Sequence, residues 1–188
     1  MRDYYIIQGE RLINALELLG LLMVLLMALL FQFVLDELPC PLCLLQRIGF
    51  LGISLGFLLN LRFGLRPSHY AVSVLSALFT AFVALRQIAL HAVPGTGSYG
   101  PAIFDLHMYT WSFIIAMLIA IFTTLSLAID RQYKAAHTKN IKWKYLTHIL
   151  FGILVILTAS NAIGVLFECG ISQCPDNPSQ YRLLEQIL

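Results

Sequence analysis

Five long apolar segments dominate this chain and restrict it to a membrane-spanning helical fold. A helix needs about 20 apolar residues to cross the roughly 30 Å hydrocarbon core of a bilayer. Backbone groups in lipid must satisfy their own hydrogen bonds, so helices are the only plausible form for such segments. We therefore predict an all-α integral membrane protein, a helical bundle of about five transmembrane spans. The predicted spans cover approximately residues 12–35, 43–61, 70–91, 109–129 and 145–167.

The composition agrees with this class. Of the 188 residues, 59% are hydrophobic and 12% are charged, whereas an ordinary soluble domain has about 25% charged residues. A soluble core of this size could not bury so much apolar surface. The length suits one membrane domain over residues 1–188, embedded in membrane lipid. The net charge of +2 is too small to indicate binding to nucleic acid.

The positive charges predict the orientation of the chain, because cytoplasmic loops carry an excess of Lys and Arg. Nine of the twelve basic residues fall on the side of the N-terminus. The N-terminus is therefore expected in the cytoplasm and, since the number of spans is odd, the C-terminal tail 168–188 in the periplasm. The nine residues are Arg2, Arg11, Arg62, Arg66, Arg131, Lys134, Lys139, Lys142 and Lys144.

The four cysteines form two pairs that this topology places on the same side. Cys40 and Cys43 follow the first span, and Cys169 and Cys174 follow the fifth. Both pairs then share the periplasm of a bacterial inner membrane, where disulfides form and persist. A four-span topology would separate the pairs across the membrane.

The strongest local signal is the segment from Pro39 to Arg47, which reads PCPLCLLQR. Cys40 and Cys43 at the start of a helix meet the partial positive charge that favours a thiolate. Arg47 lies one turn deeper on the face of Cys43, and an intramembrane arginine is by default a functional candidate. A structural disulfide and half of a metal site are the alternatives. We predict no metal, because no histidine is near and structural zinc needs four ligands.

Other polar residues have weaker signals. Cys169 and Cys174, with four residues between them, form either a structural clasp or a partner for thiol–disulfide exchange. Arg86 near the outer end of the third span either contacts a ligand or extends to the headgroups. His91 lies at that outer end. Asn161 in the fifth span is expected to hydrogen-bond between helices.

The segment from Pro39 to Arg47 resembles the disulfide bond formation protein B (DsbB) family. The likeness extends from Gln32–Leu35 through Arg86-Gln87 to Tyr109–Trp111. It implies a four-helix enzyme of the bacterial inner membrane. Such enzymes reoxidise a periplasmic thioredoxin-fold, DsbA-like dithiol oxidase and pass the electrons to ubiquinone or menaquinone. The bundle is then a four-helix core with one added C-terminal span.

The resemblance also implies roles for particular residues. By position, Cys40 and Cys43 match the quinone-proximal pair, with Cys43 meeting the quinone ring, and Arg47 matches the arginine that supports the site. We expect the quinone near the outer ends of the second and third spans. The further candidates for contact with it are Gln46, Arg86 and His91.

The chain departs from the family in its second cysteine pair. The loop Ala92–Met108, rich in turn-forming residues, contains no cysteine, although the family carries its partner-facing pair there. We expect Cys169 and Cys174 to replace that pair, so that electrons pass from the partner to them, then to Cys40 and Cys43, then to quinone. Two alternatives remain. One is a vitamin K epoxide reductase-like enzyme with the pairs in swapped roles, and the other is a metal-handling or transport protein.

Overall fold

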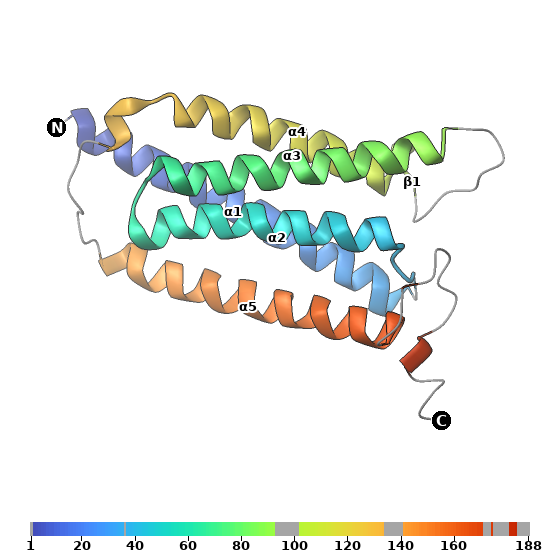
Figure 1. Cartoon of the computed structure of the whole chain (residues 1–188). Coiled ribbons are helices and arrows are strands. Elements are labelled where there is room, and N and C mark those ends of the chain that lie inside the picture. The colour runs from blue at the N-terminus through green and yellow to red at the C-terminus, as the bar shows by residue number, and fades with distance from the viewer. Residues whose placement is uncertain are drawn as a thin grey trace.

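Five long helices run antiparallel along the molecule, and each is long and apolar enough to cross a membrane (Figure 1). They confirm the predicted helical membrane bundle. The computed structural model describes residues 2–35, 37–92, 102–133, 141–170, 174 and 181–183. Within them, the helices are α1 (Arg2–Val34), α2 (Pro41–Phe63), α3 (Pro67–Leu90), α4 (Met108–Leu127) and α5 (Ile141–Cys169).

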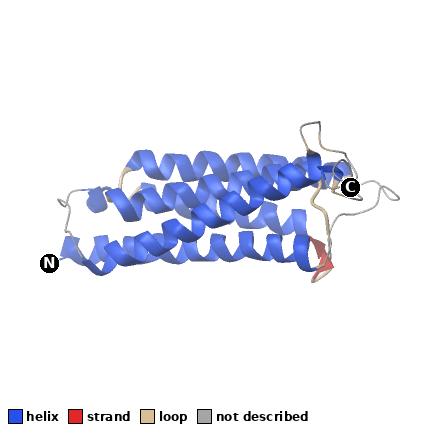
Figure 2. Ribbon diagram, turned by 90° about the horizontal axis from the view of Figure 1, so that it is seen from below, coloured by secondary structure: helices blue, strands red, loops and turns tan. Residues whose placement is uncertain are grey.

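The connections alternate between the two ends of the bundle. The N-terminus, the α2–α3 connection and the start of α5 lie at one end, and the start of α2, the end of α3 and the end of α5 lie at the other (Figures 1 and 2). Cys40 and Cys43 begin α2, and Cys169 ends α5. Both cysteine pairs therefore lie at the same end, as an odd number of spans requires.

The helices extend beyond some of the predicted apolar segments. Helix α1 begins at Arg2, whereas the apolar segment begins near Leu12. Hydropathy detects the part that lies in hydrocarbon, but helical hydrogen bonding continues into polar sequence beyond it. Most of the predicted tail 168–188 lies outside the described residues.

The end of the loop before α4 has regular structure that the sequence analysis did not predict. Strands β1 (Ala102–Ile103) and β2 (Leu106–His107) pair antiparallel. Phe104 and Asp105 between them have positive φ angles of 52° and 59°, as a two-residue hairpin turn requires. The Trp111 indole Nε1 donates a hydrogen bond of 3.0 Å to the Ile103 carbonyl, which attaches the hairpin to α4. Residues 93–101 of this loop lie outside the described residues.

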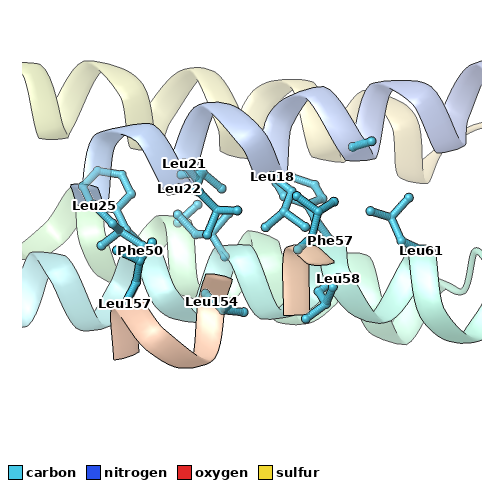
Figure 3. Close-up of a cluster of buried hydrophobic side chains, with 14 of the residues drawn as sticks. Leu18, Leu21, Leu22, Leu25, Phe50, Phe57, Leu58, Leu61, Leu154 and Leu157 are labelled. Atoms are coloured by element: carbon cyan, nitrogen blue, oxygen red, sulfur yellow. The ribbon is translucent and has the colours of Figure 1, made fainter. Parts of the chain in front are cut away.

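Leucines and phenylalanines from three helices form the central core (Figure 3). Helix α5 packs against α1 and α2 and contributes leucines to this core, so it is an integral part of the bundle. The core side chains drawn in Figure 3 include Leu18, Leu21, Leu22 and Leu25 from α1, Phe50, Phe57, Leu58 and Leu61 from α2, and Leu154 and Leu157 from α5.

Small residues bring α2 and α3 into close contact. A Cβ atom at Gly56 would lie 2.7 Å from the His69 carbonyl oxygen and would collide with Ser73. Gly49 and Gly52 meet Thr80 and Ser76 of α3 in the same way. Close approach through Gly, Ser and Thr is typical of packing between helices in lipid, and it fixes α3 firmly beside the start of α2.

A buried polar cluster closes the end of the bundle opposite the cysteines. Asn14 Nδ2 donates to the Tyr70 hydroxyl at 2.9 Å, and Asn60 Nδ2 donates to Asn14 Oδ1 at 2.9 Å. The Tyr70 hydroxyl donates to Gln132 Oε1 at 3.1 Å, in the short helix η1 (Asp130–Tyr133). Burial, with the charges of Glu10 and Asp130, raises the pKa of Tyr133 to about 12. Its hydroxyl therefore stays protonated and donates to the Leu127 carbonyl at 3.2 Å.

Candidate redox site

The first cysteine pair forms a disulfide at the N-terminus of α2. Cys40 is the N-cap residue, and its Sγ accepts a hydrogen bond from the Cys43 backbone N–H at 3.1 Å. Pro41 stands at the first helical position, which suits proline because no hydrogen-bonding N–H is lost there. Cys40 and Cys43 are disulfide-bonded, with their Cα atoms 5.0 Å apart. The positive end of the α2 dipole stabilises a thiolate on either sulfur once the pair is reduced.

Gln87 of α3 places its amide group against this disulfide. Its Nε2 lies 3.2 Å from Cys40 Sγ and 3.5 Å from Cys43 Sγ and donates to both. Its Oε1 accepts a hydrogen bond of 2.6 Å from Gln46 Nε2. Gln46 therefore orients the Gln87 amide so that its N–H groups point at the sulfur atoms. Both glutamines are buried.

On this part of α3 the sequence predicts Arg86, and not Gln87, as the candidate for contact with a quinone. The structure places Arg86 on the exposed face of the helix. Gln87, the next residue around the helix, is fully buried against the cysteines. The dipeptide Arg86-Gln87 belongs to the family likeness, but the sequence alone does not show which of its two side chains faces Cys43.

Arg47 is held by neutral acceptors from two other helices. Its Nη1 donates to Gln32 Oε1 at 2.6 Å and to Asn161 Oδ1 at 3.4 Å, and its Nη2 donates to the Ala28 carbonyl at 2.9 Å. Gln32 and Ala28 belong to α1, and Asn161 belongs to α5. These bonds compensate part of the cost of placing a guanidinium within a membrane span. They also confirm that Asn161 hydrogen-bonds between helices.

A pocket of about 130 Å³ opens beside the disulfide. Its walls come from the ends of α1, α2 and α4 and from the loop before α2, and α3 contributes no lining residue. The pocket therefore lies at the outer end of the second span, as expected for the quinone, but on the side of α1 and α4 and not on that of α3. The polar side chains and cysteines that line the pocket are Glu37, Cys40, Cys43, Gln46, Arg47, Tyr109 and Ser112.

This lining fits the head group of a quinone. Phe31, Phe50 and Val24 give apolar walls for a flat ring, and Gln46 and Arg47 bring donors for a carbonyl oxygen. Arg86 does not line the pocket. His91 does not line it either, but its ring stacks on Tyr109, a pocket residue, with centroids 5.4 Å apart. The His91 Nδ1 lies 2.8 Å from the Gln87 carbonyl oxygen.

The second cysteine pair forms a disulfide at the C-terminus of α5. Cys169 is the last helical residue, and Gly170 follows with a φ of 63°. The Gly170 N–H donates to the Leu166 carbonyl at 2.9 Å, the usual glycine stop of a helix. Cys169 and Cys174 are bonded, with their Cα atoms 4.5 Å apart. Cys169 is buried and Cys174 is half-buried.

Across the part of the chain that the structure describes, no three His, Cys, Asp or Glu side chains gather as metal ligands do. The two cysteine pairs are each closed as disulfides. Thiolates, and not disulfides, ligate metals, so the cysteines in this state offer redox chemistry.

The fold and the site define a class: a helical membrane protein with a disulfide at the mouth of an apolar pocket near one end of the bundle. The family model described as "Disulfide bond formation protein DsbB" matches residues 10–98. The chain is therefore similar to the DsbB family over this region, which contains Gln32, Cys40, Cys43, Arg47 and Gln87. The match covers slightly under half of the chain and excludes α4, α5 and the second cysteine pair. No curated protein and no solved structure matches the chain significantly.

Replacing Gln87 by leucine is expected to make the Cys40/Cys43 pair a weaker oxidant. The Gln87 amide lies against both sulfur atoms of the disulfide, and its N–H groups would donate more strongly to a thiolate than to a disulfide sulfur. A hydrogen bond is worth about 1 kcal/mol, or roughly fivefold in an equilibrium constant. The measurement is the thiol–disulfide exchange equilibrium with glutathione, followed by alkylation and mass spectrometry. The matched control is Arg86→Gln, which changes the exposed neighbour and should leave the equilibrium unchanged. An effect of Arg86→Gln equal to that of Gln87→Leu would contradict this assignment.

Proposed function

We propose that this membrane disulfide oxidoreductase transfers electrons from a periplasmic DsbA-like, thioredoxin-fold protein to ubiquinone or menaquinone. The observation that carries the proposal is the Cys40–Cys43 disulfide at the edge of an apolar pocket that Gln46 and Arg47 also line. A bound quinone supplies a two-electron acceptor there. Arg47 and Gln46 orient it, and the apolar walls exclude water from the reacting sulfur.

The polarity of the helices supports the proposed direction of electron flow. Cys40 and Cys43 lie at the positive end of α2 with Arg47 one turn below, and both features stabilise thiolates. Cys169 lies at the negative end of α5, which disfavours a thiolate. A pair whose reduced form is stabilised is the stronger oxidant. Electrons therefore move from Cys169 and Cys174 to Cys40 and Cys43, the opposite of the order in a vitamin K epoxide reductase-like enzyme.

Each transfer between the pairs is a thiol–disulfide exchange. One thiolate of the reduced C-terminal pair attacks a sulfur of the Cys40–Cys43 disulfide, and the other sulfur of that disulfide leaves as a thiolate. The second thiol of the C-terminal pair then loses its proton and attacks the mixed disulfide. The C-terminal pair is oxidised, and Cys40 and Cys43 are reduced by two electrons.

The proposed location is the bacterial inner membrane, with the N-terminus in the cytoplasm and both cysteine pairs in the periplasm. Nine of the twelve Lys and Arg residues support this orientation. The two disulfides at one end of the bundle also fit an oxidising compartment.

The proposed function is tested with the purified full chain in detergent, a reduced DsbA-like protein and a short-chain ubiquinone. We expect the partner to be oxidised at the same rate as quinol appears, measured by partner thiol titration and quinone absorbance. Oxidation of the partner without quinol formation would contradict quinone dependence. Failure of both reactions, with stoichiometric metal in the purified protein, would instead favour a metal-handling role.

A further inference from the structure

The buried seam of α5 changes from apolar to polar as it approaches the cysteine end. From Leu150 to Glu168 its buried positions alternate in steps of four and three residues, the spacing by which one helix packs continuously along others. The first three are leucines that join the core. The next three are polar or lack a side chain. In order, the positions are Leu150, Leu154, Leu157, Asn161, Gly164 and Glu168.

Asn161 is the first polar position of the seam and contacts Arg47 directly. Its Nδ2 donates to the Leu157 carbonyl at 2.8 Å, one turn earlier in α5. That bond orients the amide, so that Oδ1 is free to accept from Arg47 Nη1 at 3.4 Å. The amide is therefore an acceptor fixed in place for the guanidinium.

Gly164 contacts the Arg47 site through Gln32. A Cβ atom at position 164 would lie 3.1 Å from Gln32 Nε2, closer than most real contacts of this kind. Gln32 Oε1 is the acceptor closest to the guanidinium, at 2.6 Å from Arg47 Nη1. A glycine here leaves room for the Gln32 side chain in the position that binds Arg47.

Glu168 is the second polar position of the seam and is 0% exposed to solvent. Among the described residues, neither of its carboxyl oxygens has a hydrogen-bond partner. The charge of Arg47 acts on this carboxyl, and Tyr181 from the C-terminal region also interacts electrostatically with Arg47. Burying a carboxyl group without hydrogen bonds lowers the stability of the fold, and a leucine at this position would avoid that cost. Arg47 is the cation whose charge acts on Glu168 across space.

We propose that α5 supports the quinone site, because Asn161, Gly164 and Glu168 position Arg47 from outside the pocket. This inference rests on the proposed function. The family-matched region 10–98 supplies Arg47 and Gln32, but the seam lies beyond it. The added helix therefore carries Cys169 to the redox end of the bundle and also completes the surroundings of the arginine. The three residues act through Arg47 and are positioning residues.

The test compares three seam variants, Asn161→Leu, Gly164→Ala and Glu168→Gln, with the control Gly152→Ala. The control makes the same change in the same helix where a Cβ atom would meet nothing within 4 Å. The equilibrium dissociation constant for a short-chain ubiquinone is measured by titration calorimetry in detergent. The KM for that quinone and kcat are measured with dithiothreitol as the electron donor, so no protein partner is needed.

Each seam variant is expected to raise the dissociation constant and the KM about fivefold, the equivalent of one hydrogen bond. The kcat at saturating quinone and the melting temperature should change little, and the control should match the wild type. Seam variants that bind quinone as the control does would overturn the inference, as would an equal loss of kcat and stability in all three. Glu168→Gln keeps the shape of the side chain, so it tests the charge if Gly164→Ala fails to fold. A wild-type chain that binds no quinone would refute the proposed function itself.

Discussion

The double variant Cys169→Ala/Cys174→Ala is expected to lose oxidation of a DsbA-like partner and to keep electron transfer from dithiothreitol to quinone. The reason is the proposed electron path, in which the C-terminal pair takes electrons from the partner and passes them to Cys40 and Cys43. Burial does not distinguish the pairs, because Cys40 and Cys169 are each 4% exposed and Cys43 and Cys174 are each half-buried. The Cys40–Cys43 disulfide is the pair that lines the pocket. A small dithiol is expected to reduce it directly, without the second pair.

The measurement is the rate of quinone reduction with each of the two electron donors, using the purified full chain. The matched control is Cys40→Ala/Cys43→Ala, which should lose the reaction with both donors because no route to quinone remains. If Cys169→Ala/Cys174→Ala oxidises the partner at the wild-type rate, the C-terminal disulfide is a structural clasp that fixes the chain after α5. A double variant that also loses the dithiothreitol reaction would place the C-terminal pair next to quinone, as the swapped order requires.

Arg47→Ala is expected to lower the quinone-dependent rate by roughly tenfold or more, since a hydrogen bond to a charged group is worth about 1.5–3 kcal/mol. The substitution removes the only cationic side chain that lines the described pocket. It also leaves Gln32 Oε1 and Asn161 Oδ1 without the guanidinium that donates to them. The effect should appear mainly in the KM for quinone, because Arg47 binds and orients the acceptor while the cysteines carry the electrons.

The measurement for Arg47 is a quinone titration at fixed dithiothreitol. Arg47→Lys should fall between the alanine variant and the wild type, because lysine keeps the charge but loses the planar fork of donors. Arg62→Ala is the control, since Arg62 is an exposed arginine of the same helix that faces His148 at the other end of the bundle. Identical titration curves for Arg47→Ala and the wild type would remove Arg47 from the site.

The sequence by itself determined the helices, their number and the end of the bundle at which both cysteine pairs lie. Each of these properties depends on local sequence: an apolar segment long enough to cross a bilayer must form a helix there. Local sequence also predicts that α2 starts within the Pro-Cys-Pro-Leu-Cys segment. Helix geometry then places Arg47 one turn below Cys43. The redox candidates Cys40, Cys43 and Arg47 were therefore visible before the fold was known.

Only the tertiary structure decided which faces of the helices meet. Arg86 and Gln87 are neighbours in sequence, yet one is exposed and the other touches the disulfide, because successive residues point in directions about 100° apart around a helix. Asn161 meets Arg47 across 114 residues of sequence, and the pocket takes its walls from α1, α2 and α4. In a membrane, hydropathy assigns residues to lipid depth, but the rotation of each helix is set by close packing of small and polar side chains against its neighbours.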